Sequence, residues 1–207
     1  MQPLKQSVYM LALGCLIGIW AWSCAPTHIL RVHYQLPSKS DSLEGINAFV
    51  SFKDVRENQA MLTDNAKKAL TDYSGNFTLV VAQENGKEKL FGAYELTTML
   101  ITVFRQRLQH AGMQISENRD TEIGIEFILK EFMLDFESRN WIISISYQSN
   151  LLKNDNLILS ETISGKAERY KVAGNREAEK VIGELLTDMI NRLDVQQLFR
   201  QAGLYPQ

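Results

Sequence analysis

The sequence predicts an α+β fold: an antiparallel β-meander with two long helices packed on one face, preceded by a signal peptide and a tether. Three observations lead to this prediction. Two segments repeat their apolar residues every three or four positions, and the centre of the chain alternates apolar with polar residues. No proline interrupts residues 45–204, and the roughly 180 residues after Cys24 suit one hydrophobic core.

The first residues have the pattern of a lipoprotein signal. Lys5 precedes an apolar run from Val8 to Trp22, and the run ends at Ala21-Trp22-Ser23-Cys24. A charged start, an apolar stretch of about 15 residues and small residues before a cleavage point are typical of export signals. We expect residues 1–23 to be removed and Cys24 to become the lipidated first residue, because acyl chains on that residue would hold the domain on a membrane.

Two alternatives stay open for this segment. The apolar stretch to Ala25 approaches the roughly 17–25 residues that a membrane-spanning helix needs, so an uncleaved anchor also fits the sequence. Cleavage without lipidation is the second alternative. A lipid or an uncleaved helix would each place the domain outside the cytoplasm and tie it to a membrane.

Residues 24–44 are predicted to be the lipidated cysteine followed by an extended tether. They contain Pro26 and Pro37 and finish in a polar run from Ser38 to Ser42. Fully extended, some twenty residues reach up to roughly 65 Å. Residues 29–36 alternate apolar and polar side chains, so we expect part of the tether to fold back as a short edge strand.

Residues 45–207 are expected to form one periplasmic α+β domain. Its first half is predicted to hold strands at 46–52 and 77–82, with a polar stretch and the turn residues 71–76 between them. Asn85-Gly86 favours a turn, because Asn-Gly readily supplies the positive φ that hairpin turns require. Between Tyr94 and Ala111 the spacing of apolar residues predicts a helix, with Gly112 as its C-terminal stop.

The second half starts with a strand whose alternation changes phase. Apolar residues occupy odd positions in Ile123–Leu129 and even positions in Phe132–Phe136, so we expect a β-bulge near Lys130-Glu131. Turns are predicted at 137–140 and 150–156, with strands at 141–148 and 157–172. A final helix should follow Asn175 as its N-cap and bury the apolar residues between 181 and 193.

Composition and residue types exclude several classes of function. Removing residues 1–23 takes away one of the 22 basic residues and none of the 24 acidic ones, so the formal net charge changes from −2 to −3. That balance predicts no nucleic-acid partner. Cys15 leaves with the signal and Cys24 carries lipid, so the mature domain has no cysteine for a disulfide, a metal cluster or a nucleophile.

The remaining residues offer little chemistry. His28, His33 and His110 lack the spacing of a helical metal site, and no glycine-rich segment has the spacing of a phosphate loop. No serine lies in a Gly-x-Ser-x-Gly elbow. We therefore expect no metal, no cofactor and no enzymatic activity, while a catalytic arrangement assembled only by the fold stays open.

Several short segments carry a resemblance to known envelope proteins. The lipoprotein start, Leu36-Pro37 in the tether, Ser42–Gly45 before the first domain strand and Asp54–Ala60 after it resemble YajG-type bacterial lipoproteins. Tyr34–Pro37 is similar to the opening of the PqiC-type auxiliary lipoproteins of ABC transport systems. The resemblance implies an outer-membrane lipoprotein on the periplasmic face without catalytic residues, and in PqiC-type members also partnership with an envelope-spanning lipid-transport assembly.

Two residue sets are the candidate sites. Asp54, Arg56, Glu57 and Asn58 match the family pattern directly after a strand, so they form a candidate partner-recognition loop. The alternative for this set is a local salt bridge and turn. Phe132, Leu134, Phe136 and Trp141 are a candidate lipid groove, and the alternative is that they form the buried face of the sheet.

The leading functional hypothesis is a membrane-anchored, non-catalytic accessory or binding component of an envelope system that transports lipids or hydrophobic solutes. Its partners would be the membrane, through lipid on Cys24, and another envelope protein. Ala25 after the cysteine would be interpreted by the sorting rule of enteric bacteria as permission to travel to the outer membrane. The alternative hypothesis is a structural or regulatory envelope lipoprotein that binds another periplasmic protein or the cell wall.

Overall fold

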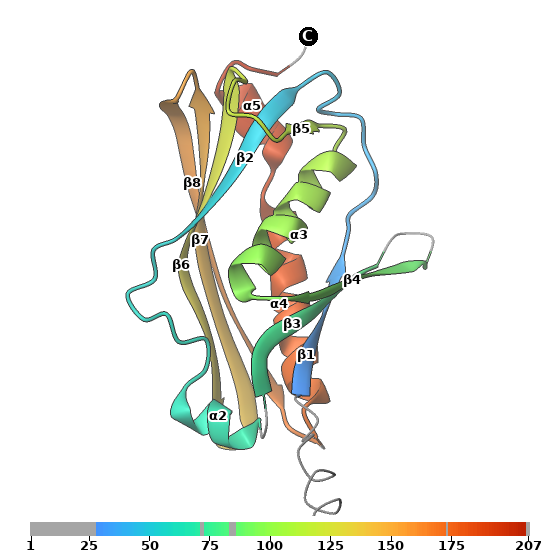
Figure 1. Ribbon diagram of the computed structural model, residues 1–207, viewed down its shortest axis with the longest axis vertical. Coiled ribbons are helices and arrows are strands. Elements are labelled where there is room, and N and C mark those ends of the chain that lie inside the picture. Colours follow the sequence, from blue (N-terminus) through green and yellow to red (C-terminus); the bar gives the residue numbers. More distant parts are fainter. Residues whose placement is uncertain (1–27, 71–72, 83–85, 173, 206–207) are drawn as a thin grey trace, which may run out of the picture.

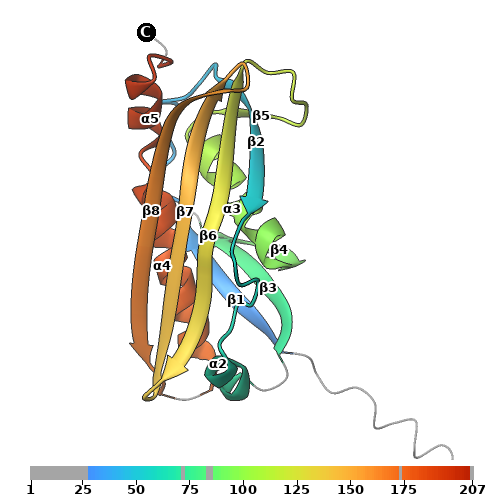
Figure 2. The same ribbon diagram turned by 90° about the vertical axis from the view of Figure 1, so that its left-hand side faces the viewer.

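The computed structural model describes residues 28–70, 73–82, 86–172 and 174–205, so Cys24 and the predicted signal lie outside the described residues. The elements are β1 (His28–Gln35), β2 (Asn47–Asp54), α2 (Asp64–Ala69), β3 (Tyr73–Ala82), β4 (Glu88–Tyr94), α3 (Leu96–His110), β5 (Gln114–Ser116), β6 (Ile123–Glu137), β7 (Asn140–Lys153), β8 (Asn156–Tyr170), α4 (Arg176–Arg192) and α5 (Val195–Gln201). A five-stranded sheet of order β5-β2-β6-β7-β8 forms one layer. Helices α3 and α4, with a three-stranded sheet of order β1-β3-β4, cover one face of it (Figures 1 and 2). The α+β prediction is confirmed.

Strands β6, β7 and β8 form the predicted antiparallel meander. Their two hairpins turn at Ser138-Arg139 and Asn154-Asp155, whose φ angles of 49° and 67°, and of 49° and 59°, are typical of tight two-residue turns. The pairing of β6 with β7 shifts between Leu129 and Glu131, which confirms the predicted bulge. The turn predicted at 150–156 is wrong in extent, because β7 continues to Lys153.

The meander does not extend through the whole sheet. Strand β2 pairs in parallel with β6 and with β5, and in the small sheet β1 pairs in parallel with β3. The segment between β2 and β6 crosses to the other layer and returns, and such a crossover is what brings two strands into parallel order. Alternation within a strand carries no information about its neighbour's direction, so the sequence could not reveal this arrangement.

Residues 28–44, which belong to the segment predicted to be a tether with part of it folded back, pack on the domain. Strand β1 lies at the edge of the small sheet, as its alternation predicted, and Leu30, Val32 and Tyr34 are fully buried. Leu43 is fully buried as well, so β1 and the segment after it pack with the residues from 45 on that were expected to form the domain. Three apolar side chains on one side of an alternating strand are stabilised by burial, which explains why this segment packs on the domain.

Helix α4 covers the free edge of β1. The backbone N–H of Arg31 donates to Glu179 Oε1 at 2.9 Å, and that of Gln35 donates to Thr187 Oγ1 at 3.1 Å. Asn191 Nδ2 donates to the Gln35 carbonyl at 2.9 Å. Residues four apart share one face of a helix, so these side chains take the place of a neighbouring strand along β1.

Gly183 stands in the middle of that face. A Cβ added there would lie 2.6 Å from the carbonyl oxygen of His33. The close approach of α4 to the β1 backbone therefore requires glycine at this position.

The core lies between the large sheet and the helices. Phe104 of α3 stacks on Phe127 of β6 with ring centroids 3.7 Å apart, and Tyr147 of β7 meets Phe104 edge-on at 5.0 Å. The Tyr147 hydroxyl donates to the Met189 carbonyl of α4 at 2.9 Å, so the ring's polar end is satisfied inside the core. Burial raises the pKa of this hydroxyl far above its usual value, so it stays protonated.

Both long helices occur where the spacing predicted them. Helix α3 ends at His110 and Gly112 follows with φ of 94°, while Asn175 occupies the N-cap of α4 without making a side-chain capping bond. The four short elements α2, β4, β5 and α5 were not predicted from the sequence. In the described part of the chain, each helix is too short or too polar to cross a bilayer.

Candidate functional site

The loop after β2 leaves the edge of β6 and then returns to it. Strand β2 pairs with β6 as far as Asp54, and the Val55 N–H still donates to the Leu129 carbonyl at 3.0 Å. The chain returns six residues later, where the Leu134 N–H donates to the Met61 carbonyl at 2.8 Å. Residues 55–60, here called the 55–60 loop, therefore arch over the stretch of β6 that contains the bulge.

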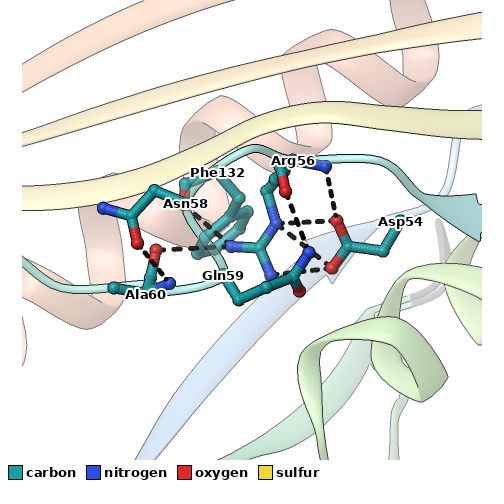
Figure 3. Close-up of polar contacts among 6 residues, drawn as sticks. All are labelled: Asp54, Arg56, Asn58, Gln59, Ala60 and Phe132. Carbon is teal, nitrogen blue, oxygen red and sulfur yellow. Dashed lines mark hydrogen bonds and ion pairs between the residues drawn. The ribbon is translucent and has the colours of Figure 1, made fainter.

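Arg56 points inward and holds this loop in place (Figure 3). Its Nε donates to Asp54 Oδ1 at 2.9 Å and its Nη2 to Asp54 Oδ2 at 2.7 Å, a two-pronged pairing of a planar cation with a carboxylate. Its Nη1 donates to the carbonyls of Phe132 at 3.3 Å and Ala60 at 3.4 Å. Strand β2 does not pair with β6 at Phe132, so the guanidinium supplies the hydrogen-bond donor for the Phe132 carbonyl.

The Asp54–Arg56 pair is ionic. The hydrogen bonds from the Arg56 side chain lower the pKa of the Asp54 carboxyl below its ordinary value, against the opposing effect of its partial burial. Arg56 is only 8% exposed, so removing either member would leave the other charge poorly solvated. The pair is a structural brace, in agreement with the alternative interpretation of a local salt bridge and turn.

The four predicted recognition residues divide into two roles. Asp54 and Arg56 face one another, whereas Glu57 and Asn58 are exposed on the outside of the 55–60 loop. Asn58 Oδ1 also accepts the Ala60 N–H at 2.9 Å, which fixes the turn locally. Val55, which alternation did not single out, is 53% exposed beside them.

A shallow hollow of about 490 Å³ lies between the outer side of this loop and the bulge of β6. Its lining residues are Val55, Arg56, Glu57, Asn58, Lys130, Glu131, Phe132 and Met133. The bulge turns Lys130 and Glu131 toward solvent together, which places a cation and a carboxylate next to the apolar Val55. This mixed surface suits a protein partner better than it suits a small apolar ligand.

The four residues of the candidate groove belong to the core. Phe132 is 1% exposed, and Leu134 and Trp141 are fully buried. Phe132 meets Phe77 of β3 at 6.0 Å, and the partly buried Phe136 packs on Trp141 at 4.6 Å. Their side chains pack against other protein atoms, as expected for the buried face of a sheet.

A second hollow, of about 420 Å³, was not foreseen from the sequence. Arg107 of α3, Ser40, Ser42 and the end of α4 line it. The Arg107 Nε is buried without a hydrogen-bond partner. These residues come from distant parts of the chain, so no local sequence pattern could have grouped them.

The outer face of the large sheet is polar. Ser146 and Ser164 are joined by a hydrogen bond of 2.7 Å, and Gln148 Nε2 donates to Ser160 Oγ at 2.8 Å. Farther along, Lys53 Nζ lies 2.6 Å from Glu126 Oε1. The face opposite the helices therefore carries a network of polar side chains, as is common on the solvent side of an antiparallel sheet. Within the described residues, His, Cys, Asp and Glu side chains form no group of three that could hold a metal ion.

Comparisons with known proteins relate the chain to others by structure. No family model matches the sequence, and no curated protein matches it either. A Xanthomonas campestris protein described by the family model DUF330 has a TM-score of 0.50 and 9% identity, and the match covers 83% of this chain and 98% of that one. The two proteins share a fold. This likeness shows the fold alone, because the identity is so low.

Two further solved structures are similar at a lower level. Rare lipoprotein B from Shewanella oneidensis has a TM-score of 0.41 and 11% identity over 75% of this chain and 98% of that one. The PelC dodecamer from Paraburkholderia phytofirmans has a TM-score of 0.34 and 11% identity over 74% of this chain and 92% of that one. Both scores are too low to support an inference about this chain.

Proposed function

We propose that this chain is a bacterial envelope lipoprotein, anchored through lipid on Cys24, that acts by binding a partner rather than by catalysis. The observation that carries the proposal is the start of the sequence, where a cation, an apolar run and small residues lead directly to that cysteine. The position of the first strand supports it. Strand β1 begins at His28, so the folded domain follows the candidate anchor almost immediately.

The finer assignment is an accessory component of an envelope system for lipids or hydrophobic solutes, at the periplasmic face of the outer membrane. The resemblance of Tyr34–Pro37 to PqiC-type lipoproteins supports the transport role, and Ala25 after the cysteine supports sorting to the outer membrane. An accessory protein of this kind needs a stable surface for another envelope protein.

The proposed surface for that protein is the outside of the 55–60 loop, formed by Val55, Glu57 and Asn58. The Asp54–Arg56 brace fixes the loop to β6, and a surface that is already ordered loses less entropy when a partner binds. Val55 supplies apolar area at its centre, and Glu57 supplies a charge at its rim.

The anchor is tested by Cys24→Ala in the native host. We expect the variant to lose acyl chains by mass spectrometry and to leave the membrane fraction or stop maturing. Unchanged membrane retention without acylation would contradict the lipid anchor and favour an uncleaved helix.

The binding surface is tested by placing a photo-crosslinking amino acid at Glu57 and, as a control, at Thr162 on the polar outer face of the sheet. Both side chains are exposed, so both positions should accept the probe without unfolding the domain. We expect discrete crosslinked products from position 57 only. Transporter subunits among them would support the accessory role, whereas wall or scaffold proteins alone would favour the structural lipoprotein.

A further inference from the structure

The start of β1 and a small set of exposed apolar and basic residues lie at the same end of the molecule. Figures 1 and 2 show the beginning of β1 at the same end as α2, the β6–β7 turn, the end of β8 and the start of α4. The hydrogen bonds agree, because the Arg31 N–H of β1 donates to Glu179 in the first turn of α4, and the Lys171 N–H after β8 donates to the Arg139 carbonyl at 2.8 Å.

The reach of the chain limits where this end can be. His28 is four positions after Cys24 in the sequence. At roughly 3.3–3.6 Å for each residue, that segment spans at most about 14 Å even when fully extended. If Cys24 carries the lipid, as the proposed function requires, the end that holds the start of β1 must lie close to the headgroups.

The side chains at this end suit such a position. Tyr170 is 52% exposed and Val172 is 75% exposed, and they are two of the six large apolar side chains that are exposed among the described residues. The Arg139 guanidinium lies 5.2 Å from the centre of the Tyr170 ring, and Lys171 Nζ lies 5.0 Å from the Phe136 ring. Aromatic residues flanked by long cations are enriched where proteins meet the bilayer surface, because their apolar parts enter it while their charges stay hydrated.

Neighbouring residues at the same end carry both signs of charge. Lys67 and Lys68 of α2 and Arg176 of α4 are exposed there. The exposed carboxylates include Asp64, which lies 3.4 Å from Lys67 Nζ, and Glu137 at the β6–β7 turn. The cations closest to the exposed apolar pair, Arg139 and Lys171, contact aromatic rings. The ion pairs of the described residues do not include either side chain, so both charges can interact with phosphate groups.

We propose that Arg139, Tyr170, Lys171 and Val172, here called the membrane tip, rest on the phospholipid headgroups of the bilayer that holds the Cys24 anchor. The proposal rests on the proposed lipid anchor. It fixes the orientation of the domain: the long strands β6, β7 and β8 stand away from the bilayer. At about 3.3 Å for each residue, the 15 residues of β8 place the β7–β8 turn roughly 50 Å from the membrane.

The test compares the two ends of β8 in the acylated full-length protein, purified from the native host and reconstituted into vesicles of phosphatidylethanolamine and phosphatidylglycerol with brominated acyl chains. An environment-sensitive fluorophore is attached in turn to Val172→Cys at the tip and to Leu157→Cys at the far end. Both native side chains are exposed apolar residues, and Leu157 is 58% exposed. The Cys24 thiol is acylated, so it does not react.

The proposal expects the bromines to quench the fluorophore at position 172 at least threefold more than the one at position 157. Arg139→Glu should reduce quenching at position 172 by about half, whereas Lys153→Glu at the far end should not change it. Equal quenching at both positions, or none at either, would contradict the proposal that the membrane tip rests on the headgroups, and it would not contradict the lipid anchor.

Two other outcomes also count against the proposal. Energy transfer between labelled copies at position 172, without quenching by lipid, would show that a second copy covers the tip instead. Absence of acyl chains from the purified protein, seen in its intact mass, would refute the lipid anchor and with it the argument from reach.

Discussion

The packing of α4 on β1 makes Gly183→Ala an informative substitution. The added Cβ would lie 2.6 Å from the His33 carbonyl oxygen and 3.2 Å from the His33 backbone nitrogen. Both atoms belong to the backbone of β1, which the small sheet holds on its other side, so α4 must move outward. Gly165→Ala in β8 is the matched control, because its Cβ would meet the flexible ends of Met189 at 2.8 Å and Leu185 at 3.0 Å.

The expected cost follows from three contributions. Alanine in a helix interior is favoured over glycine by about 1 kcal/mol. Forcing an extra carbon into a packed contact typically costs about 1–3 kcal/mol. Moving α4 also weakens its hydrogen bonds to Arg31 and Gln35, which contribute roughly 0.5–1.5 kcal/mol each when formed. Together these terms predict a loss of about 2 kcal/mol for Gly183→Ala, and a loss of under about 1 kcal/mol for Gly165→Ala, where side chains can give way.

Thermal unfolding followed by circular dichroism measures the difference. For a domain of 150–250 residues, each kcal/mol changes the melting temperature by roughly 2–4 °C, so Gly183→Ala should melt about 4–8 °C below the wild type. Gly165→Ala should melt less than about 4 °C below the wild type. A Gly183→Ala protein as stable as the wild type would refute the claim that the β1 backbone dictates glycine at this position.

Three further predictions concern the 55–60 loop and the core. Arg56→Met should destabilise the domain by about 3 kcal/mol in urea unfolding, because Asp54 is left charged and partly buried. Lys67→Met, whose ion-pair partner Asp64 is exposed, should destabilise it by under about 1 kcal/mol, and equal losses would argue against the brace. Because the folded state lowers the pKa of Asp54, its contribution to stability is present above the unfolded pKa, about 3.9, and is lost as pH falls through the folded pKa. Asp54→Asn should therefore show a shallower loss of unfolding free energy below about pH 4 than the wild type, and identical acid profiles would contradict this assignment. Phe132→Ala should lower the free energy of unfolding by about 3–5 kcal/mol, since the ring fills the core, and should leave the lipid content of the purified protein unchanged. A stable variant with less bound lipid would support the lipid-groove hypothesis instead.

The features predicted well from the sequence are those fixed by local periodicity. The spacing of Leu100, Val103 and Phe104 predicts α3, and the phase change around Lys130 predicts the bulge, because each pattern reflects one buried face. The parallel pairing of β2 with β6 was missed, since it depends on where the intervening chain travels. Short elements such as α2, with one buried residue in six, leave too weak a pattern to detect.

The candidate loop shows the same limit at the level of single residues. Asp54 and Arg56 are two positions apart, so on extended chain they share a side, and a local salt bridge was a reasonable alternative to recognition. Sequence alone could not reveal that the Phe132 carbonyl, 76 residues away, completes the arrangement. That contact makes Arg56 a structural residue and leaves the outward side of the loop as the proposed binding surface.

The hydrogen bonds between the edge of β1 and α4 limit the order in which an exported chain can fold. They join residues 148 to 156 positions apart. A chain that crosses a membrane with its N-terminal part leading delivers β1 early, and the helix that covers its edge arrives only near the end. Until then the strand nearest the anchor offers an unpaired edge, which other chains can join. A nascent protein of this design would therefore gain most from a holding chaperone during the interval between the arrival of its first strand and that of its last long helix.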